Sequence, residues 1–517
     1  MIQSAPPLQD QAIYMHKNGI IILYSLLFTF CLFLLFYRLD ARLLWGDEAE
    51  TALLAKNTVR FGIPKTIDGV NHITVLGNLR DENEDHVWTW APWLQEYLVA
   101  GMYLLFSANT WTSRAAFAGI GWLSVVLLAQ VTYRVYRDHR VALGSAFLLG
   151  TAEIFLLQSR QCRYYSVTVF AEILLLYGAF DLLKNRRQAI WFLGFGLILQ
   201  FYTNFVVAAA NLPLLIALSW FNRRQRQALI KAVAVVAVFV LTALPWVAYA
   251  HTWRQSRELI HEDVVAKALY YFTEWHFHFV PWILLLLPLA GLFTRTRPSE
   301  ATLLIRQLEQ SLSILIIGYF VTLLLPRSEL RYLLPLLPVG CLLVSAWLFR
   351  YLPWPTLAAA LILLQAGTNL LAVATTFGLN REHTWRAPLV QFIGGLNQTF
   401  TDRFTDVRDF FSREARPGQA VWTPDPEFPL IFYNGLKIVD GRLRVPDSLP
   451  DWILPQSASG LLDQKPLEVP ESVKQYYELV IIPVHDSDRL DCVPEPDVYQ
   501  YRSVTKRSNF VIYRKRT

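Results

Sequence analysis

Residues 19–37 read GIIILYSLLFTFCLFLLFY, and this stretch decides the fold class, because it is apolar and close to the roughly 20 residues that cross a membrane as a helix. A cleaved signal peptide has a shorter apolar core and a small-residue cleavage site. Here Arg38, Leu39, Asp40 and Ala41 follow without such a site. We therefore expect an uncleaved first transmembrane helix.

The composition places most of the chain in a membrane. Of 517 residues, 54% are hydrophobic and 17% are charged, against roughly a quarter charged in soluble domains, and the mean hydropathy is +0.31. The net charge is +6, but Lys and Arg fall in short clusters between apolar runs, which is typical of cytoplasmic membrane loops and excludes a nucleic-acid partner. Four cysteines exclude a disulfide scaffold.

Further apolar runs follow between residues 92 and 377. With residues 19–37 they predict a polytopic α-helical membrane protein with about 11–13 transmembrane helices. The runs lie at 92–109, 115–133, 143–157, 166–183, 189–203, 205–221, 230–250, 279–293, 308–325, 332–349 and 354–376. The basic clusters would share one side, which is then cytoplasmic. A cytoplasmic N-terminus, twelve spans and an external C-terminus are incompatible, so we expect one miscounted segment, within 189–221 or within 92–133.

The composition divides the chain in two. Residues 1–378 are predicted to form the membrane module, with a first external loop at 38–90, and residues 379–517 an external α/β domain. In the second part, strand-like runs occur at 420–422, 430–433, 479–483 and 510–513, and residues 402–413 show helical periodicity.

The sequence Trp45-Gly-Asp-Glu-Ala-Glu50 follows the first span and opens a helical pattern. Asp47 as N-cap with Glu50 three residues later predicts a capping box. A carboxylate pair just outside a membrane can also supply a general base, and the two roles are compatible. Because Asp47 and Glu48 would lie about 100° apart on a helix, we expect only one of them to face a reacting centre.

The order of several motifs resembles that of the GT-C glycosyltransferases, in particular the protein-mannosyltransferase and aminoarabinose-transferase branch (glycosyltransferase family 39-like). The similar segments cover roughly the first 350 residues. They are Gly46-Asp-Glu-Ala49, Trp90-Ala-Pro-Trp-Leu-Gln-Glu-Tyr-Leu98, Ser113-Arg-Ala115, Gln158-Ser-Arg-Gln-Cys-Arg-Tyr-Tyr165 and Arg331-Tyr-Leu-Leu-Pro-Leu-Leu-Pro338.

This resemblance implies a GT-C fold and a membrane hexosyl- or pentosyltransferase. Such an enzyme moves a sugar from a polyprenyl-phosphate donor lipid to a glycolipid, glycan or protein acceptor outside the membrane, as in lipopolysaccharide or protein glycosylation. It implies that Asp47 activates the acceptor hydroxyl. We expect Glu48 to support Asp47 or to bind the acceptor. One base and one stabilised leaving group suffice for a single inverting displacement. We expect no cofactor to be required.

A lipid-phosphate leaving group needs cationic partners. Arg160, Arg163 and Arg331 each lie beside a span on the expected external side, and Arg114 is a fourth candidate that could instead pair with a loop carboxylate. Interfacial anchoring, in which long basic side chains reach the lipid headgroups, is the competing interpretation for each of them.

Two loops hold weaker candidates. His261 and Glu262, and Trp90 near the second expected span, could contact the acceptor or the carrier, although surface polarity and an interfacial aromatic belt explain them as well. The run from Asp81 to His86 could bind a divalent cation, but a solvated loop is the commoner outcome, and we predict no metal site. The aminoarabinose branch has a basic residue beside its prolines where this chain has Trp90-Ala-Pro-Trp93, so donor or acceptor is expected to differ.

The expected location is the bacterial inner membrane, with multiple spans, a periplasmic C-terminal domain and undecaprenyl phosphate as carrier. A transporter or lipid flippase is the alternative from another class. Transporters tend to place ionisable residues near the bilayer midplane in internally related halves. In this chain the charges lie mostly at span ends and no half-repeat is evident.

Overall fold

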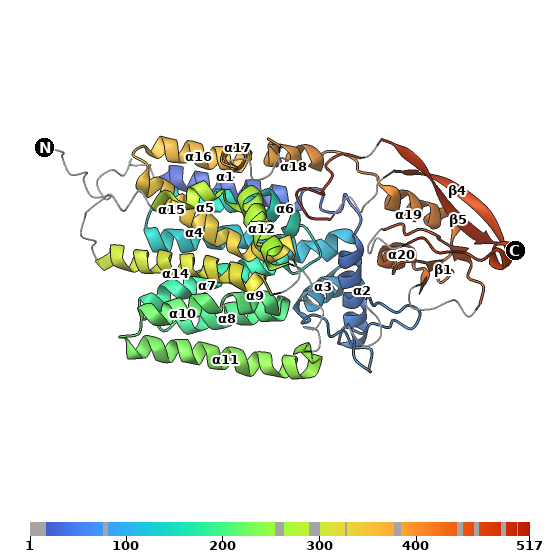
Figure 1. Ribbon diagram of the computed structural model, residues 1–517, viewed down its shortest axis with the longest axis horizontal. Coiled ribbons are helices and arrows are strands. Elements are labelled where there is room, and N and C mark those ends of the chain that lie inside the picture. The colour runs from blue at the N-terminus through green and yellow to red at the C-terminus, as the bar shows by residue number, and fades with distance from the viewer. Residues whose placement is uncertain are drawn as a thin grey trace.

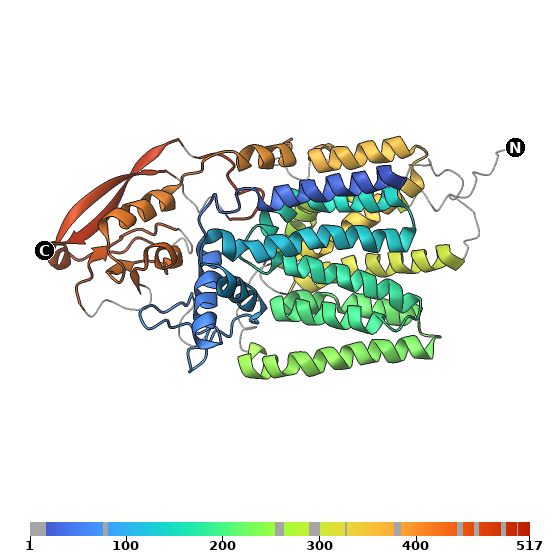
Figure 2. The same cartoon turned by 180° about the vertical axis from the view of Figure 1, so that it is seen from behind.

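In the computed structural model, a long helical bundle stands at one end of the molecule and a β-sheet at the other, with helices α2 and α3 between them (Figure 1). The structure describes residues 17–75, 81–253, 263–288, 300–325, 328–376, 384–441, 448–459, 465–486, 493–503 and 505–516. The reverse view shows the same three zones along the long axis (Figure 2).

Most of the described chain is helical. The helices up to the middle of the chain are α1 (Lys17–Phe36), α2 (Gly46–Phe61), α3 (Leu94–Leu105), α4 (Thr110–Tyr136), α5 (His139–Thr151), α6 (Glu153–Ser159), α7 (Tyr165–Leu183), α8 (Ala189–Thr203), α9 (Phe205–Ala210), α10 (Leu212–Phe221) and α11 (Arg226–Ala250). After them come α12 (Val264–Glu274), a π-helical turn (Trp275–Phe279), α13 (Trp282–Leu285), α14 (Glu300–Leu323), a 3₁₀ segment (Leu330–Leu336), α15 (Leu337–Tyr351), α16 (Pro355–Gly367), α17 (Leu370–Ala374), α18 (Pro388–Leu396), α19 (Arg403–Glu414), α20 (Phe428–Asn434) and α21 (Glu471–Lys474).

The polytopic helical fold class is confirmed, with fewer full-length spans than the 11–13 expected from hydropathy. Among the described residues, six helical segments are long and apolar enough to cross a membrane, or seven if the bent pair α5–α6 is one span. Three shorter apolar helices account for other expected runs, at Ala189–Thr203, Phe205–Phe221 and Pro355–Gly367. Breaks shorten these runs: α5 and α6 meet at 61°, and Asn204 caps α9 with its side chain.

The expected span at residues 92–109 is wrong. Its helix, α3, has only 12 residues and packs beside α2, and α4 begins at the same end of the bundle that α2 and α3 occupy (Figures 1 and 2). Gln95 and Glu96 make the start of α3 too polar for a lipid-facing helix, and both are buried in protein instead. The miscounted segment therefore lies within 92–133. Without this span, a cytoplasmic N-terminus and an external C-terminus are compatible.

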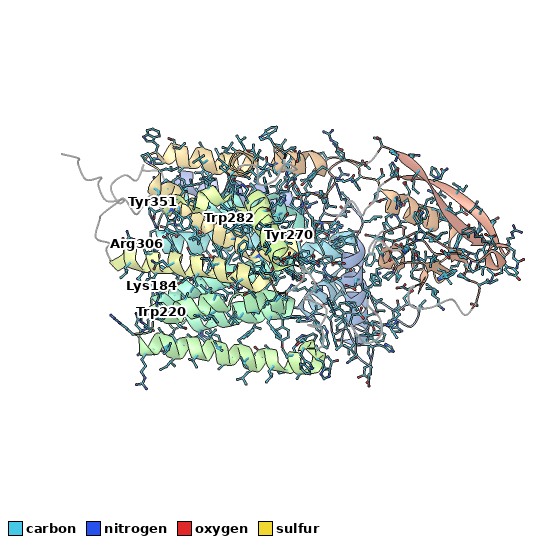
Figure 3. The ribbon with its side chains drawn as sticks, viewed as in Figure 1. Lys184, Trp220, Tyr270, Trp282, Arg306 and Tyr351 are labelled. Carbon is cyan, nitrogen blue, oxygen red and sulfur yellow. The ribbon has the colours of Figure 1, made fainter. Side chains whose placement is uncertain are left out.

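The basic end of the bundle lies far from the sheet. Lys184 and Arg306 mark that end, whereas Tyr270 and Trp282 lie nearer to α2 (Figure 3). The tendency of basic loops to stay cytoplasmic predicts that the end holding α2, α3 and the sheet faces outward.

The C-terminal region contains a five-stranded mixed sheet. Its strands are β1 (Ala420–Thr423), β2 (Lys437–Asp440), β3 (Trp452–Ile453), β4 (Tyr477–His485) and β5 (Arg507–Lys515), in the order β2-β1-β3-β5-β4. β1 is parallel to β2 and β3, and β5 is antiparallel to β3 and β4. The expected strand at 430–433 is wrong, because Pro429 starts helix α20 there and Gly435, at φ 63°, ends it.

The sheet region and the first loop share one apolar core. Leu44 and Trp88 from the loop belong to the same buried cluster as Phe411 of α19, Val421 of β1 and Trp452 of β3. Burial of common apolar surface stabilises the contact between the two parts. The sheet therefore rests directly on the segment that contains Asp47.

Cysteine labelling tests the position of α3. Val70, before α3, and Ser107, after it, are both exposed. Single Val70→Cys and Ser107→Cys substitutions, in a chain whose own cysteines are replaced by Ser, should react with a membrane-impermeant maleimide from the same side, whereas Lys184→Cys, after α7, should react from the opposite side. Reaction of Val70→Cys and Ser107→Cys from opposite sides would show that residues 92–109 cross the membrane.

Candidate active site

The N-terminus of α2 positions two adjacent carboxylates differently. Trp45 precedes the helix, and its backbone N–H faces the Glu48 carboxylate at 3.4 Å. The expected capping box is therefore wrong by two residues, since Trp45 and Glu48, not Asp47 and Glu50, occupy its positions. Glu48 turns into the protein, whereas the Asp47 side chain is 24% exposed.

Glu48 is fully buried and forms a two-point ion pair with Arg114 of α4. Arg114 Nε lies 2.8 Å from Glu48 Oε1, and Nη2 lies 2.5 Å from Oε2. The backbone N–H of Cys162 donates to Glu48 Oε1 at 2.6 Å. This arrangement joins α2, α4 and the turn after α6, and it suits Glu48 to an organising role rather than to proton transfer.

The remaining donors of Arg114 hold the loop before α2. Nη1 donates to the carbonyls of Leu39 and Arg42, both at 2.9 Å, and Nη2 donates to Leu43 at 3.0 Å. All five N–H groups of this guanidinium thus have protein acceptors. The sequence left open whether Arg114 binds a phosphate or pairs with a carboxylate. In the structure it pairs with the carboxylate of Glu48.

Arg160 holds the end of the first span. Its Nη1 donates to the carbonyls of Leu34 and Leu35 at 2.8 and 3.0 Å, and its Nη2 donates to those of Tyr37 and Arg38, both at 3.1 Å. The last carbonyls of a helix lack intrahelical partners, and a basic side chain satisfies them here. This guanidinium therefore acts on α1 in the described structure.

Arg163 and Arg331, which lie far apart in the sequence, both approach Asp47. Arg163 Nη2 lies 3.5 Å from Asp47 Oδ2, and Arg331 Nη1 lies 3.4 Å from the same oxygen. Arg331 Nη1 also donates a hydrogen bond to the hydroxyl of Tyr165, at 3.1 Å. Arg163 further faces Glu50 at 3.6 Å. We call these five residues the Asp47 cluster.

Buried polar atoms around this cluster lack partners among the described residues. They are Nε of Arg163, Nε of Arg331, Oε1 of Glu50 and Oε2 of Glu96. A buried donor or acceptor without a hydrogen bond costs about 1–3 kcal/mol, so native proteins keep few of them. Two guanidinium donors beside one partly exposed carboxylate make a polar site suited to an anionic ligand.

Burial raises the pKa of two acidic side chains, Glu50 and Glu96. It raises the pKa of Glu96 to about 7, and hydrogen bonding from Gln95, at 2.8 Å, offsets part of this effect. The pKa of Glu50 is also raised well above its ordinary value, mainly by burial, with Arg163 opposing the shift. The two acids and Arg163 therefore form one electrostatically coupled group.

Other candidates lie elsewhere. Trp90 is 38% exposed, and its neighbour Trp93 packs edge-on against Trp246 and Tyr249 of α11. His261 and Glu262 lie outside the described residues. Sequence reasoning missed Tyr165 and Glu96, although both stand inside quoted motifs, because a motif does not show which members face inward.

The comparisons with known proteins agree with this architecture. The chain matches no protein-family model. It is 29% identical over 210 residues to undecaprenyl phosphate-alpha-4-amino-4-deoxy-L-arabinose arabinosyl transferase 1 from Pseudomonas fluorescens, over 37% of this chain. The chain spans 38% of the length of that curated relative.

Two solved structures share the fold. ArnT from Cupriavidus metallidurans bound to undecaprenyl phosphate superposes with a TM-score of 0.55 at 15% identity, covering 82% of this chain and 86% of that one. The apo state of the same protein gives a TM-score of 0.53 at 17% identity, covering 81% and 85%. This chain is thus a multi-pass membrane protein with an ArnT-like fold. The resemblance to GT-C glycosyltransferases noted in the sequence is confirmed at the level of the fold.

The Glu48–Arg114 pair should be required for folding. Glu48→Gln leaves a buried guanidinium without its counter-charge, and breaking such a pair costs about 3–5 kcal/mol. We expect a clearly lower melting temperature in detergent than that of the wild type. Asp47→Asn, one residue away and partly exposed, serves as control and should melt near the wild type; equal losses in both variants would contradict the division of roles.

Glu96 should make stability depend on pH. Because its folded pKa of about 7 exceeds the ordinary 4.5, the folded protein keeps a proton that the unfolded chain releases between these values. Stability should fall as pH rises through this window, by up to about 1.4 kcal/mol per pH unit, with no further loss above pH 7.

Glu96→Gln, which is neutral at every pH, isolates this contribution. The difference in melting temperature between Glu96→Gln and the wild type should grow in favour of the variant from pH 4.5 to 7 and then stay level. A difference that does not change with pH would show that Glu96 ionises normally.

Proposed function

We propose that this protein is a glycosyltransferase that takes a sugar from a polyprenyl-phosphate donor and passes it to an acceptor at the external membrane face. The observation that carries the proposal is the Asp47 cluster, in which one partly exposed carboxylate lies between two arginines that retain unpaired buried N–H groups. The ArnT-like fold supports it, since one related structure holds undecaprenyl phosphate and the curated relative is named as an arabinosyl transferase.

Asp47 acts on the acceptor. Its carboxylate accepts the proton of the attacking hydroxyl as the new bond to the anomeric carbon forms. Arg163 holds the start of α2 by donating to the Asp47 carbonyl at 3.2 Å and to the Thr51 hydroxyl at 3.0 Å. These contacts fix the carboxylate in position before the acceptor arrives, so that little reorganisation is needed.

Arg331 and Arg163 act on the leaving group. As the bond to the sugar breaks, negative charge grows on the lipid phosphate, and fixed guanidinium donors stabilise that charge. Tyr165 and Glu329 orient Arg331, at 3.1 Å and 3.2 Å. The displacement inverts the anomeric centre in one step and requires no nucleotide site and no cofactor.

The location follows from the charge distribution. The Asp47 cluster lies at the end of the bundle opposite the basic loops, so we assign it to the periplasmic side of a bacterial inner membrane. The acceptor is a glycolipid, glycan or protein of the cell envelope. Trp90-Ala-Pro-Trp93 stands where the aminoarabinose branch has a basic residue, and we infer a donor sugar or acceptor different from that branch.

Sugar transfer by purified protein in lipid tests the proposal. Undecaprenyl-phosphate sugars and the matching nucleotide sugars are offered as donors, and transfer or slow hydrolysis is expected from the lipid donors alone. Asp47→Asn should lower the rate on the order of 10²–10⁴-fold, the usual contribution of a general base. Turnover of nucleotide sugars would overturn the lipid donor, and a rate unaffected by Asp47→Asn would overturn the role of Asp47. No transfer from any donor would favour a transporter.

The matched control is Asp138→Asn. Asp138 caps α5 at the basic end of the bundle, and Asn is an equally good cap, so this variant should keep the wild-type rate. Arg331→Lys retains the charge but loses the guanidinium fork. We expect a loss on the order of 10²-fold, and an unchanged rate would remove Arg331 from the leaving-group role.

A further inference from the structure

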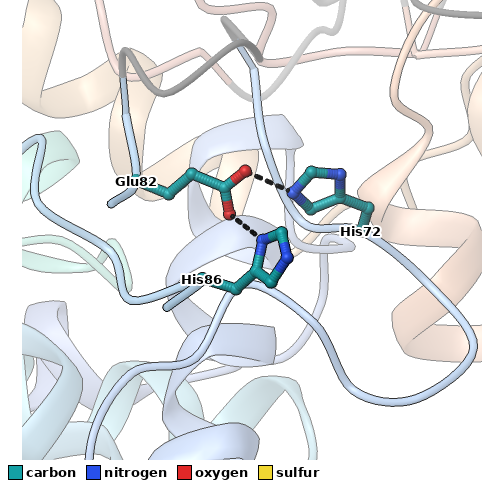
Figure 4. A group of neighbouring side chains, drawn as sticks. All are labelled: His72, Glu82 and His86. Atoms are coloured by element: carbon teal, nitrogen blue, oxygen red, sulfur yellow. Dashed lines mark hydrogen bonds and ion pairs between the residues drawn. The ribbon is translucent and has the colours of Figure 1, made fainter. Parts of the chain in front are cut away.

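Three side chains of the first external loop meet at one point, away from the Asp47 cluster. His72 Nε2 lies 2.8 Å from Glu82 Oε1, and His86 Nδ1 lies 3.1 Å from Glu82 Oε2. Figure 4 shows both imidazoles turned toward the same carboxylate. The Glu82 side chain is 3% exposed, whereas those of His72 and His86 are 37% and 47% exposed. We call these three residues the loop triad.

The ligand atoms of the loop triad have the spacing of a metal site. All three lie within 4.8 Å of one another, and ligand atoms around one tetrahedral zinc ion, at bond lengths near 2.0–2.1 Å, are about 3.3 Å apart. Small movements would therefore admit an ion between them. Two imidazoles and one carboxylate favour zinc or a similar transition metal over calcium or magnesium, which prefer oxygen ligands.

The surroundings of the loop triad favour a cation. Glu84 and Asp85 follow Glu82 in the same turn and add negative charge. The hydroxyl of Thr66 donates to Glu82 Oε2, the kind of outer contact that orients a ligating carboxylate. The backbone of His86 has a φ of 55°, a conformation that non-glycine residues seldom adopt, and this turn directs its ring toward Glu82.

A second group of similar composition differs in one decisive respect. Glu274, His278 and Asp497 also gather their ligand atoms within 4.8 Å. However, Arg386 Nη2 lies 3.1 Å from His278 Nδ1 and 3.8 Å from Asp497 Oδ1. A guanidinium already supplies the positive charge there, and it would repel a metal ion.

We propose that the loop triad binds one divalent transition-metal ion of the zinc class, with water completing its coordination. The ion occupies the lone pairs of His72 Nε2 and His86 Nδ1, and each imidazole is neutral when bound, with its single proton on the other ring nitrogen. Its role is structural, because the loop triad lies in the segment that connects α2, which carries Asp47, to α3, which carries Glu96.

The loop triad also lies beside the contact with the sheet. Asn71, next to His72, donates to the Leu436 carbonyl at 3.1 Å and accepts from the backbone N–H of Ile438 at 2.8 Å. A metal ion that fixes His72 would therefore also hold the neighbouring contact between Asn71 and the C-terminal sheet.

The test uses full-length protein purified with a tag that contains no histidine, stripped with EDTA and titrated with zinc chloride alone. We expect one zinc ion per chain by elemental analysis and a higher melting temperature with zinc. The double variant His72→Gln/His86→Asn keeps amide N–H groups that can donate to Glu82, and Asn tolerates the left-handed backbone at position 86. It should fold but bind zinc at least about 100-fold more weakly.

His278→Gln, in the second group, is the matched control and should bind zinc as the wild type does. The proposal is overturned if the wild type binds no stoichiometric zinc, if the double variant binds as tightly as the wild type, or if His278→Gln alone abolishes binding. Because the readouts are metal content and melting temperature, the result does not depend on the donor sugar or on the proposed transfer reaction.

Discussion

The buried pair between Glu48 and Arg114 is the constraint on which the α2 end of the molecule depends. A carboxylate and a guanidinium at this depth would be costly singly, and they are tolerated because every donor of Arg114 has an acceptor. The pair fixes the segment between α1 and α2, the start of α2 and the turn after α6. Arg163 lies in that turn, so its distance from Asp47 is set by the same pair.

Asp47 and Glu48 are adjacent in sequence but have different surroundings. A step of about 100° along a helix sends neighbouring side chains in different directions. Glu48 faces the interior of the protein and stabilises the scaffold, whereas Asp47 faces the arginines and a partly exposed surface. Arg114 and the backbone N–H of Cys162 occupy both oxygens of Glu48, whereas the partly exposed Asp47 carboxylate is open to a ligand.

Sequence patterns predicted most of the helices and the angular separation of Asp47 from Glu48, since both follow from local periodicity. They failed for residues 92–109, because apolar content does not distinguish a short helix packed on protein from one that crosses lipid. They also did not separate the roles of the arginines. Arg160 bonds to carbonyls about 120 residues earlier and Arg331 reaches Asp47 across 284 residues, and no short-range pattern encodes such contacts.

Asn71, in the segment between α2 and α3, limits how the sheet can pair with other strands. β2 is an edge strand, and its outward backbone groups at Leu436 and Ile438 would otherwise offer a template for a strand of another molecule. The Asn71 side-chain amide fills both hydrogen bonds, as the peptide group of a neighbouring strand would. A single asparagine thus blocks strand addition at this point of the β2 edge, whereas β4 forms the opposite edge of the sheet.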